Sequence, residues 1–445
     1  MSERFPAEEV SADVVERAIL VGIDRGRDDW PIEESLAELA RLADTAGAEI
    51  VGTVTQRMDR PNPRTFVGSG KAEEIAERAR SEDAALIIFD DDMTPSQQKN
   101  LEDLIPGATI LDRTALILDI FAQHATSREG KLQVDLAKLE YVLPRLRGMW
   151  GHLEAERLGG GRGARFGAGE SQLETDRRLT RRRIGELRRE LKHVAGERDL
   201  QRKSRVRSGV YRVALVGYTN AGKSTLLNAL TGADVLAYDK LFATLDSTTR
   251  RTEIPEGREV TITDTVGFIN KLPHGLVEAF KSTLDEVREA DLLLHVTDSA
   301  QSQREPQMQA VDEVLAEIGA SGKRHILVFN KAELLSDQDR AMLAARYPRA
   351  VFVSALKGEG LQVLRDRIAE EAASGSTTLT TLVPYTRGDL IQLAHDRAQI
   401  LSERHTQDGT LIVVRLPAEL VSKFEQFAIS AEPDRENVEA GGPDD

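Results

Sequence analysis

The stretch GYTNAGKST, residues 217–225, constrains this chain more than any other part of the sequence. A strand-like run, RVALV, ends just before it, and a helix-like run, STLLNAL, follows. The residues that match the frame GxxxxGK[ST] are Gly217, Gly222, Lys223 and Ser224. In this frame backbone N–H groups surround phosphates, the lysine reaches the β and γ phosphates, and the hydroxyl binds magnesium. The sequence therefore predicts a nucleotide site between a strand and a helix of an α/β domain.

A second glycine run, VGSGK at residues 67–71, lacks two features of this frame. Thr65 stands where the first glycine is needed, and Ala72 follows the lysine where a hydroxyl is needed. We therefore interpret VGSGK as a strand-to-helix turn and not as a second nucleotide site.

Apolar runs alternate with helix-like polar segments in two separate parts of the chain. The first part holds AILVGI, EIVGTV and AALIIF, and the second holds YRVALVG, EVTITD, DLLLHVTD, HILVFN and AVFVSA. This alternation is typical of βαβ units with parallel sheets. We predict an α/β protein whose P-loop domain follows an α/β domain with a helical hairpin arm and precedes a small α+β domain. The expected bounds are 1–128, 129–207 for the arm, 208–376, 377–430, and 431–445 for an acidic disordered tail.

The arm is predicted from two helical patterns that flank a glycine-rich loop, Gly159–Gly169. The first pattern places on one helix face Leu132, Leu136, Leu139, Val142 and Leu146. The second has an apolar seam of Leu173, Leu179, Ile184, Leu187 and Leu191. Its basic residues include Arg177, Arg178, Arg181, Arg182, Arg183, Arg188, Arg189 and Lys192. Cations outnumber Glu186, Glu190 and Glu197, which are spaced to pair with them, so we expect a phosphate-contacting surface, with a solvated helix face as the alternative.

Composition narrows the range of functions. A chain of 445 residues is too long for one ordinary domain, and its net charge of -15 limits any nucleic-acid contact to a local basic patch. Aromatic residues make up 4%, which argues against extensive stacking on single-stranded nucleic acid. We find no apolar run long enough to span a bilayer, no secretory signal and no cysteine, so the cytoplasm is the expected compartment.

Three further motifs follow the phosphate loop, each at the end of a strand-like run. Asp264-Thr265-Val266-Gly267 ends EVTIT, and there the aspartate can hold magnesium through water and the Gly267 N–H can sense a γ-phosphate. Asn330-Lys331 ends HILVF, where a guanine ring would lie against the lysine stem. Ser354-Ala355-Leu356 ends the next run. Because the carboxyl ends of parallel strands meet at one edge of a sheet, the motifs together predict a G-protein switch.

These motifs resemble those of the HflX family of ribosome-associated P-loop GTPases. The similar segments are GYTNAGKSTLLNALTG, LFATLDSTTRR, DTVGFI, SAL and, upstream, GESQLETDRR. The resemblance implies binding of GTP, GDP and Mg²⁺. It implies that the phosphates contact Gly217, Tyr218, Thr219, Asn220, Ala221, Gly222, Lys223 and Ser224. The implied first switch is Phe242, Ala243, Thr244, Leu245 and Asp246, and the second is Asp264, Thr265, Val266 and Gly267.

The resemblance also implies roles for individual residues. The implied guanine-binding residues are Asn330, Lys331, Glu333, Ser354, Ala355 and Leu356. The implied metal ligands are Ser224, Thr244 and Asp264, with Thr248 or Thr249 as the alternative to Thr244. The residues implied in catalysis are Lys223, Ser224, Thr244 and Gly267.

The function that the resemblance implies is binding to the large ribosomal subunit and its rRNA, with splitting or rescue of stalled or idle ribosomes under stress. GTP hydrolysis would be stimulated by that contact, and we expect a partly ribosome-associated monomer. The rRNA would be contacted through Arg177, Arg178, Arg181, Arg182, Arg183 and the loop Gly159–Gly169. Two alternatives are a P-loop ATPase of relaxed nucleotide specificity that acts on RNA, and a non-catalytic RNA-binding protein.

Two departures from the usual motifs affect these expectations. The guanine-reading motif normally ends in aspartate, but here Glu333 has one methylene more, which predicts a GTP preference relaxed toward ATP. In many small GTPases a glutamine after DxxG orients the attacking water, and here that position is Phe268. The sequence therefore predicts slow basal hydrolysis, with the missing group supplied from elsewhere in the chain or by the partner.

Overall fold

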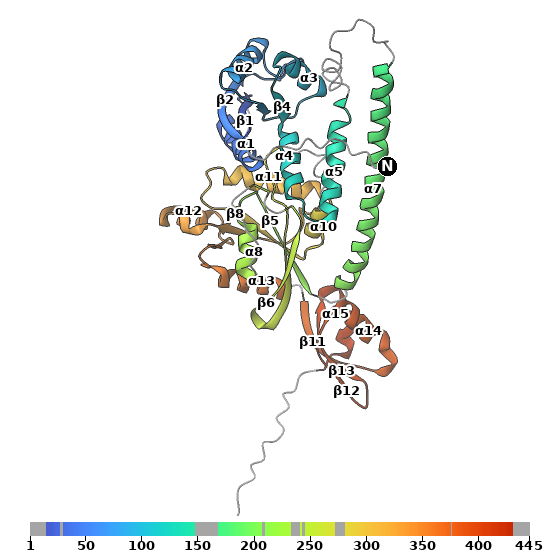
Figure 1. The fold of residues 1–445 in the computed structure, drawn as a ribbon. Coiled ribbons are helices and arrows are strands. Elements are labelled where there is room, and N and C mark those ends of the chain that lie inside the picture. The colour runs from blue at the N-terminus through green and yellow to red at the C-terminus, as the bar shows by residue number, and fades with distance from the viewer. Residues whose placement is uncertain are drawn as a thin grey trace, which may run out of the picture. The chain divides into compact units, whose positions relative to one another are not determined.

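A computed structural model describes residues 15–26, 30–146, 168–206, 210–232, 241–242, 245–271, 281–374 and 376–429 (Figure 1). The chain divides into two compact units. The first contains most residues up to Leu361, and the second contains those from Gln362 onward together with 196–212 and 251–261. Among the helices of the described residues, none is long and apolar enough to cross a membrane.

The first sheet is parallel and has the strand order β2-β1-β3-β4. Its strands are β1 (Arg17–Asp24), β2 (Glu49–Arg57), β3 (Leu86–Phe89) and β4 (Thr109–Asp112). Its helices are α1 (Ile32–Ala46), α2 (Ser69–Ser81), α3 (Pro95–Leu104) and α4 (Arg113–His124). VGSGK does form the start of a helix, α2, but β2 ends well before it, at Arg57.

The apolar side chains of β1 alternate between the two faces of this sheet, and helices pack on both faces. Ile19 and Val21 pack in the cluster that holds Ile75 and Leu101, from α2 and α3. Leu20 packs in the cluster with core residues of α1 and α4. Because successive side chains of a strand point to opposite faces, the parallel sheet is packed against helices on both sides.

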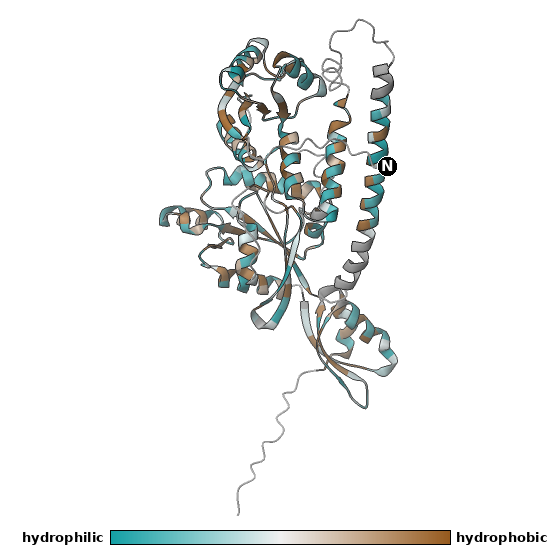
Figure 2. Cartoon of the chain, viewed as in Figure 1, coloured by the Kyte–Doolittle hydropathy of each residue, from teal (hydrophilic) through white to brown (hydrophobic). Residues whose placement is uncertain are grey.

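The arm consists of α5 (Arg128–Val142) and α7 (Ala168–Val206), as the two helical patterns predicted. Their shared core contains Leu132, Leu136, Ile184 and Leu187. The expected seam is wrong at Leu179, whose 49% exposure follows from its spacing of five residues from Ile184, which turns it to another side of the helix. Figure 2 shows polar residues along much of α7. The side chain of Leu173, the position of Arg147 and the loop before α7 lie outside the described residues.

The second sheet has the strand order β10-β9-β8-β5-β7-β6 and contains the five expected P-loop strands together with β6, which the sequence pattern did not predict. They are β5 (Tyr211–Gly217), β6 (Thr248–Ile254), β7 (Arg258–Asp264), β8 (Leu292–Asp298), β9 (His325–Asn330) and β10 (Val351–Phe352). The helices are α8 (Lys223–Thr231), α10 (Lys281–Glu289), α11 (Arg304–Glu317), α12 (Asp337–Arg346) and α13 (Leu361–Ser374). The short 3-10 helix η1 (Pro255–Gly257) connects β6 to β7, and η2 (Ala332–Leu334) lies between β9 and α12. β5, β8, β9 and β10 run parallel, so the carboxyl ends of these four strands share one edge.

The C-terminal part is a small antiparallel sheet with helices, in the order β11-β13-β12. Its elements are β11 (Ser376–Val383), η3 (Tyr385–Arg387), α14 (Gly388–Arg397), β12 (Gln399–His405), β13 (Thr410–Pro417), α15 (Ala418–Phe424) and η4 (Glu425–Phe427). The sequence pattern predicted a strand, a helix and one further strand. It missed β12, because most of its residues are exposed and show no apolar alternation.

Candidate nucleotide-binding site

The phosphate loop connects β5 to α8 and depends on two glycines. A Cβ on Gly217 would lie 2.1 Å from the carbonyl oxygen of Val296 in the neighbouring strand β8. Gly222 has a φ of +87°, and a Cβ there would lie 2.3 Å from Nδ2 of Asn330. A left-handed backbone and these close approaches exclude every other residue type without a local shift. The loop therefore has the tight turn that the GxxxxGK[ST] frame requires.

Lys223 is the buried cation of the loop. Its Nζ donates to the carbonyl oxygens of Gly217 and Tyr218 at 3.2 and 3.0 Å. Burial lowers the pKa of Lys223 to about 8, and the nearby Asp264 carboxylate opposes this shift. A buried ammonium group that has backbone carbonyls as partners gains strongly from an anionic ligand.

Ser224 and Asp264 bring a hydroxyl and a carboxylate together at the end of the loop. Ser224 Oγ donates to Asp264 Oδ2 at 2.5 Å. Both groups are hard oxygen ligands of the kind that Mg²⁺ prefers, so the donor set fits this ion. A Cβ on Gly267 would lie 2.7 Å from the Cα of Thr219 and 3.1 Å from Nζ of Lys223. The DTVG segment is therefore packed directly against the phosphate loop.

Phe268 joins the same segment to the loop through its backbone. Its N–H donates to the Gly217 carbonyl at 3.1 Å, and its carbonyl accepts from the Thr219 N–H at 2.7 Å. Its side chain is 1% exposed and lies in the core. Phe268 is therefore a packing residue, and its side chain cannot orient a water molecule.

Asn330 connects three of the predicted motifs. Its Nδ2 donates to the Ala221 carbonyl at 2.9 Å, and its Oδ1 accepts from the Ala355 N–H at 3.0 Å. Lys331 adopts a φ of +59°, and its Nζ forms an ion pair with Asp298 at 2.8 Å. Sequence reasoning missed Asp298, although it ends the buried strand β8 at the same edge of the sheet as the motifs.

Glu333 lies in η2, directly after the Asn330-Lys331 pair. Its Oε2 is buried and has no hydrogen-bond partner among the residues that the structure describes. A buried carboxylate oxygen without a donor is costly, so this atom indicates a place for a ligand donor. Of the third strand-end motif, Ser354 and Ala355 are buried, whereas Leu356 is 79% exposed.

The first switch is described only in part. Ala243 and Thr244 lie outside the described residues. The Phe242 N–H donates to Thr219 Oγ1 at 3.1 Å. The Phe242 ring packs edge to face against Phe121 of α4, with 4.6 Å between the ring centroids. The alternative threonines, Thr248 and Thr249, lie in β6, and Thr249 Oγ1 is 2.9 Å from Thr263 Oγ1.

Tyr218 of the phosphate loop contacts helix α1 of the N-terminal α/β domain, which sequence reasoning did not foresee. Its hydroxyl donates to Glu38 Oε1 at 2.6 Å and accepts from the Asn270 N–H at 2.6 Å. Burial, reinforced by the Glu38 carboxylate, raises the pKa of Tyr218 well above its usual value. The Tyr218 hydroxyl therefore stays protonated and donates its hydrogen bond to Glu38.

A buried ion network continues from Glu38. Arg113 pairs with Glu38 at 3.2 Å and with Asp90 at 2.7 Å, and Asp90 also pairs with Lys271 at 2.6 Å. Glu38, Asp90 and Arg113 are each 1% exposed or less. Lys271 follows the DTVG segment by only a few residues. The network, which we call the Arg113 network, therefore joins both nucleotide motifs to α1, α4 and the residue that follows β3 in the N-terminal α/β domain.

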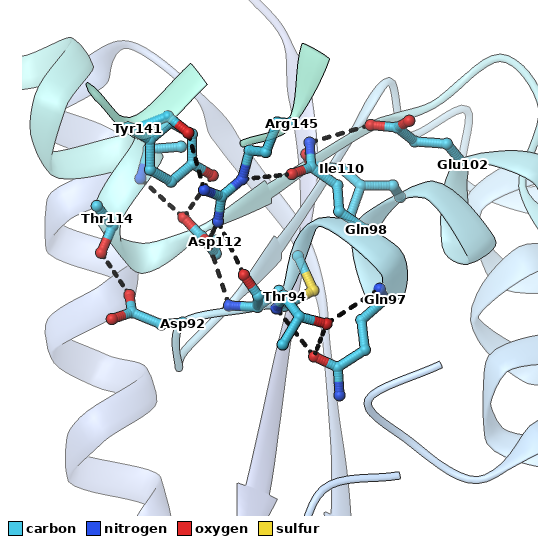
Figure 3. A network of polar contacts seen from close by, with 12 residues as sticks. Asp92, Thr94, Gln97, Gln98, Glu102, Ile110, Asp112, Thr114, Tyr141 and Arg145 are labelled. Carbon is cyan, nitrogen blue, oxygen red and sulfur yellow. Dashed lines mark hydrogen bonds and ion pairs between the residues drawn. The ribbon is translucent and has the colours of Figure 1, made fainter. Parts of the chain in front are cut away.

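A second polar network fixes the end of α5 to the N-terminal sheet (Figure 3). Arg145 donates to Asp112 Oδ2 at 3.0 Å, to the Met93 carbonyl at 2.8 Å and to Gln98 Oε1 at 3.0 Å. Tyr141 donates to Asp112 Oδ1 at 2.9 Å and lies under the Arg145 guanidinium at 3.5 Å. Burial raises the pKa of Asp112 despite these partners.

The basic face of α7 combines exposed arginines with local ion pairs. Arg182 and Arg183 pair with Glu186, and Arg188 pairs with Glu140 of α5 at 2.8 Å. The i,i+4 pairing expected from the sequence is present, as in Arg182–Glu186. Exposed pairs of this kind contribute little stability, and most of their arginines remain exposed to solvent.

Comparison with known proteins follows the same division of the chain. Residues 33–122 match the family described as GTP-binding GTPase N-terminal, and residues 124–205 match GTP-binding GTPase Middle Region. Residues 212–331 match 50S ribosome-binding GTPase. Over 415 residues the chain is 46% identical to GTPase HflX of Caldanaerobacter subterraneus subsp. tengcongensis, covering 93% of this chain and 94% of that protein.

The chain belongs to the HflX family of GTPases. It is also 43% identical over 408 residues to GTPase HflX of Escherichia coli, covering 91% of this chain and 94% of that protein. A solved structure of a GTP-binding protein from Sulfolobus solfataricus in complex with GDP is 26% identical, with a TM-score of 0.44, and covers 81% of this chain and 99% of that chain. As a member of the HflX family, the protein is a GTPase that binds GTP and GDP, and it falls among the ribosome-associated GTPases.

Proposed function

We propose that GTP binds with its phosphates in the loop Gly217–Ser224 and its base at Glu333. The observation that carries this proposal is the convergence of Lys223, the Ser224–Asp264 pair and Gly267 on one loop. Ser224, Thr244 and Asp264 would hold Mg²⁺, directly or through water. The bound ion would neutralise charge on the β and γ phosphates.

The chain's own catalytic contribution is mainly electrostatic. The Lys223 ammonium group and the Gly267 N–H stabilise negative charge that develops on the γ-phosphate. Because the Phe268 side chain is in the core, the chain places no group there to orient the attacking water. Basal hydrolysis is therefore slow and depends on a partner for acceleration.

That partner is the large ribosomal subunit, and the contact runs through the arm. Support comes from the family description 50S ribosome-binding GTPase and from the exposed arginines of α7. Arg177, Arg178 and their neighbours would neutralise rRNA phosphates, together with the loop Gly159–Gly169. The protein would act as a cytoplasmic monomer that splits or rescues stalled or idle ribosomes under stress.

The first test is steady-state hydrolysis of GTP and of ATP by the full chain, alone and with large ribosomal subunits. We expect a slow basal GTP rate that rises roughly 10²-fold or more with subunits, since a partner-supplied group is worth about 10³–10⁵ in related GTPases. Binding to subunits should weaken steeply as salt rises. A rate indifferent to subunits, or one that favours ATP, would support the alternative of a P-loop ATPase acting on RNA.

Substitution of Glu333 tests how the base is selected. Glu333→Ala should raise the KM for GTP by about 5- to 150-fold, because the ring donors lose a buried acceptor worth roughly 1–3 kcal/mol. The KM for ATP should not change. Glu333→Asp should increase the preference for GTP over ATP, because it restores the shorter side chain of the usual motif.

The matched control for Glu333 is Glu359→Ala, which removes an exposed carboxylate near the same edge of the sheet. It should leave both KM values unchanged. Equal losses toward GTP and ATP in Glu333→Ala would show that Glu333 supports the fold and does not read guanine.

A further inference from the structure

Asp246, in the first switch, is bound by the junction between α4 and α5. Its Oδ2 accepts from the Thr126 N–H at 3.0 Å, the Thr126 hydroxyl at 2.8 Å and the Ser127 N–H at 2.7 Å. The Ser127 hydroxyl donates to Oδ1.

The junction that holds Asp246 is also the N-terminus of the arm. Ser127 caps α5 by accepting from the Gly130 N–H at 2.9 Å. Gly130 lies so close to the carboxylate that a Cβ there would be 2.5 Å from Asp246 Oδ1. A side chain at this position would displace the aspartate, so the sequence leaves room for the contact.

The helix α5 is therefore held at both ends. Its far end is bound to β4 through Arg145 and Asp112 (Figure 3), and its start holds Asp246. Along its length it packs on α7 through Leu132, Leu136, Ile184 and Leu187. Because α5 packs on α7 along its length, a displacement of α7 would also shift α5 and its first turn.

On the other side, Asp246 is close in sequence to residues that contact the phosphate loop. Phe242, four residues before it, donates to Thr219 and packs on Phe121 of α4. Thr244 lies between these two anchored residues. Asp246, which the α4–α5 junction holds, is therefore two residues in sequence from Thr244, the expected metal ligand of the first switch.

We propose that the contact of Asp246 with Thr126 and Ser127 couples the arm to the first switch. The inference rests on the proposed binding of the arm to the large ribosomal subunit. When the subunit displaces α7, α5 moves its first turn, and the switch moves with it. By linkage, the nucleotide in the site changes the affinity of the arm for the subunit by the same factor. Thr126, Ser127 and Gly130 are positioning residues in this scheme.

The test separates coupling from catalysis by changing only the arm side of the contact. In Thr126→Val/Ser127→Ala and in Gly130→Ala, subunit-stimulated GTP hydrolysis should fall at least about fivefold, within the usual range of coupling energies. Basal GTP hydrolysis, GTP affinity and the melting temperature should stay close to those of their controls. The ratio of subunit affinities with a non-hydrolysable GTP analogue and with GDP should approach one.

Two variants serve as matched controls. Ser336→Ala removes an equivalent helix-capping serine at the start of α12, and Gly185→Ala adds a methyl to α7 where nothing lies within 4 Å. Both should be stimulated like the wild type. If the wild type is stimulated and the Thr126, Ser127 and Gly130 variants are stimulated equally, the coupling is overturned and the proposed function stands. If the wild type is not stimulated at all, the proposed function fails, and this inference fails with it.

Discussion

Lys223→Ala should reduce GTP hydrolysis by roughly 10²–10³-fold, a loss typical of removing one group that stabilises transition-state charge. The side chain is buried in the phosphate loop, and its Nζ lies beside the loop carbonyls and next to Gly267. No other side chain in the described part of the loop carries a positive charge. The measurement is single-turnover GTP hydrolysis together with binding of a fluorescent GTP analogue.

The pH dependence of binding gives this prediction a second readout. Because the pKa of Lys223 is lowered to about 8, the free chain loses this charge as the pH rises through 8. Bound phosphates favour the charged form, so GTP affinity is full below pH 8 and falls above it. Lys223→Ala should remove this dependence.

The control for this prediction comes from the other glycine run. Lys71→Ala removes the corresponding lysine of VGSGK, which pairs with Glu74 at the start of α2. It should leave hydrolysis and GTP binding unchanged. A comparable loss in Lys71→Ala, or an unchanged rate in Lys223→Ala, would contradict the assignment of phosphate binding to GYTNAGKST and not to VGSGK.

Short-range patterns predicted most of the strands and helices that carry the candidate nucleotide site. The strand before Gly217, the helix after it and the strand ends at Asp264 and Asn330 all follow from local periodicity and motif spacing. The arm was predicted in the same way, from apolar residues repeating along one helix face. The prediction is wrong at Leu179 because this apolar residue lies five positions before Ile184, a spacing that turns it away from the shared face of the helix.

Contacts between distant parts of the chain were not predictable from one sequence. Nothing local to Tyr218 indicates that its hydroxyl meets Glu38, 180 residues away in the chain. Asp246 and Ser127 likewise come together only in the fold. Among the residues that make these contacts, Asp90 was the easiest to recognise from the sequence as a candidate for a functional position. It belongs to an acidic run directly after the buried strand β3, and such a run marks the carboxyl edge of a parallel sheet. These long-range polar contacts connect the N-terminal sheet and the arm to the nucleotide motifs.

Arg113→Met should lower the free energy of unfolding by about 3–5 kcal/mol, because it leaves Glu38 and Asp90 as buried charges that have lost their shared cation. Arg113 is 1% exposed and is the common partner of both carboxylates. The measurement is urea unfolding followed by the fluorescence of Trp30, whose ring stacks on Tyr218 at 6.0 Å. A Trp150→Phe background removes the other of the chain's two tryptophans.

Two comparisons decide whether the loss comes from buried charge. Arg188→Met breaks an ion pair whose arginine side chain is 66% exposed, and it should cost less than about 1 kcal/mol. Glu38→Gln added to Arg113→Met should recover part of the stability, because the amide replaces an uncompensated carboxylate and still accepts from Tyr218. If Glu38→Gln recovers nothing, the loss in Arg113→Met reflects packing of the guanidinium and not its charge. If Glu38→Gln does recover stability, the Arg113 network is the electrostatic connection that holds the phosphate loop, through Tyr218, against helix α1 of the N-terminal α/β domain.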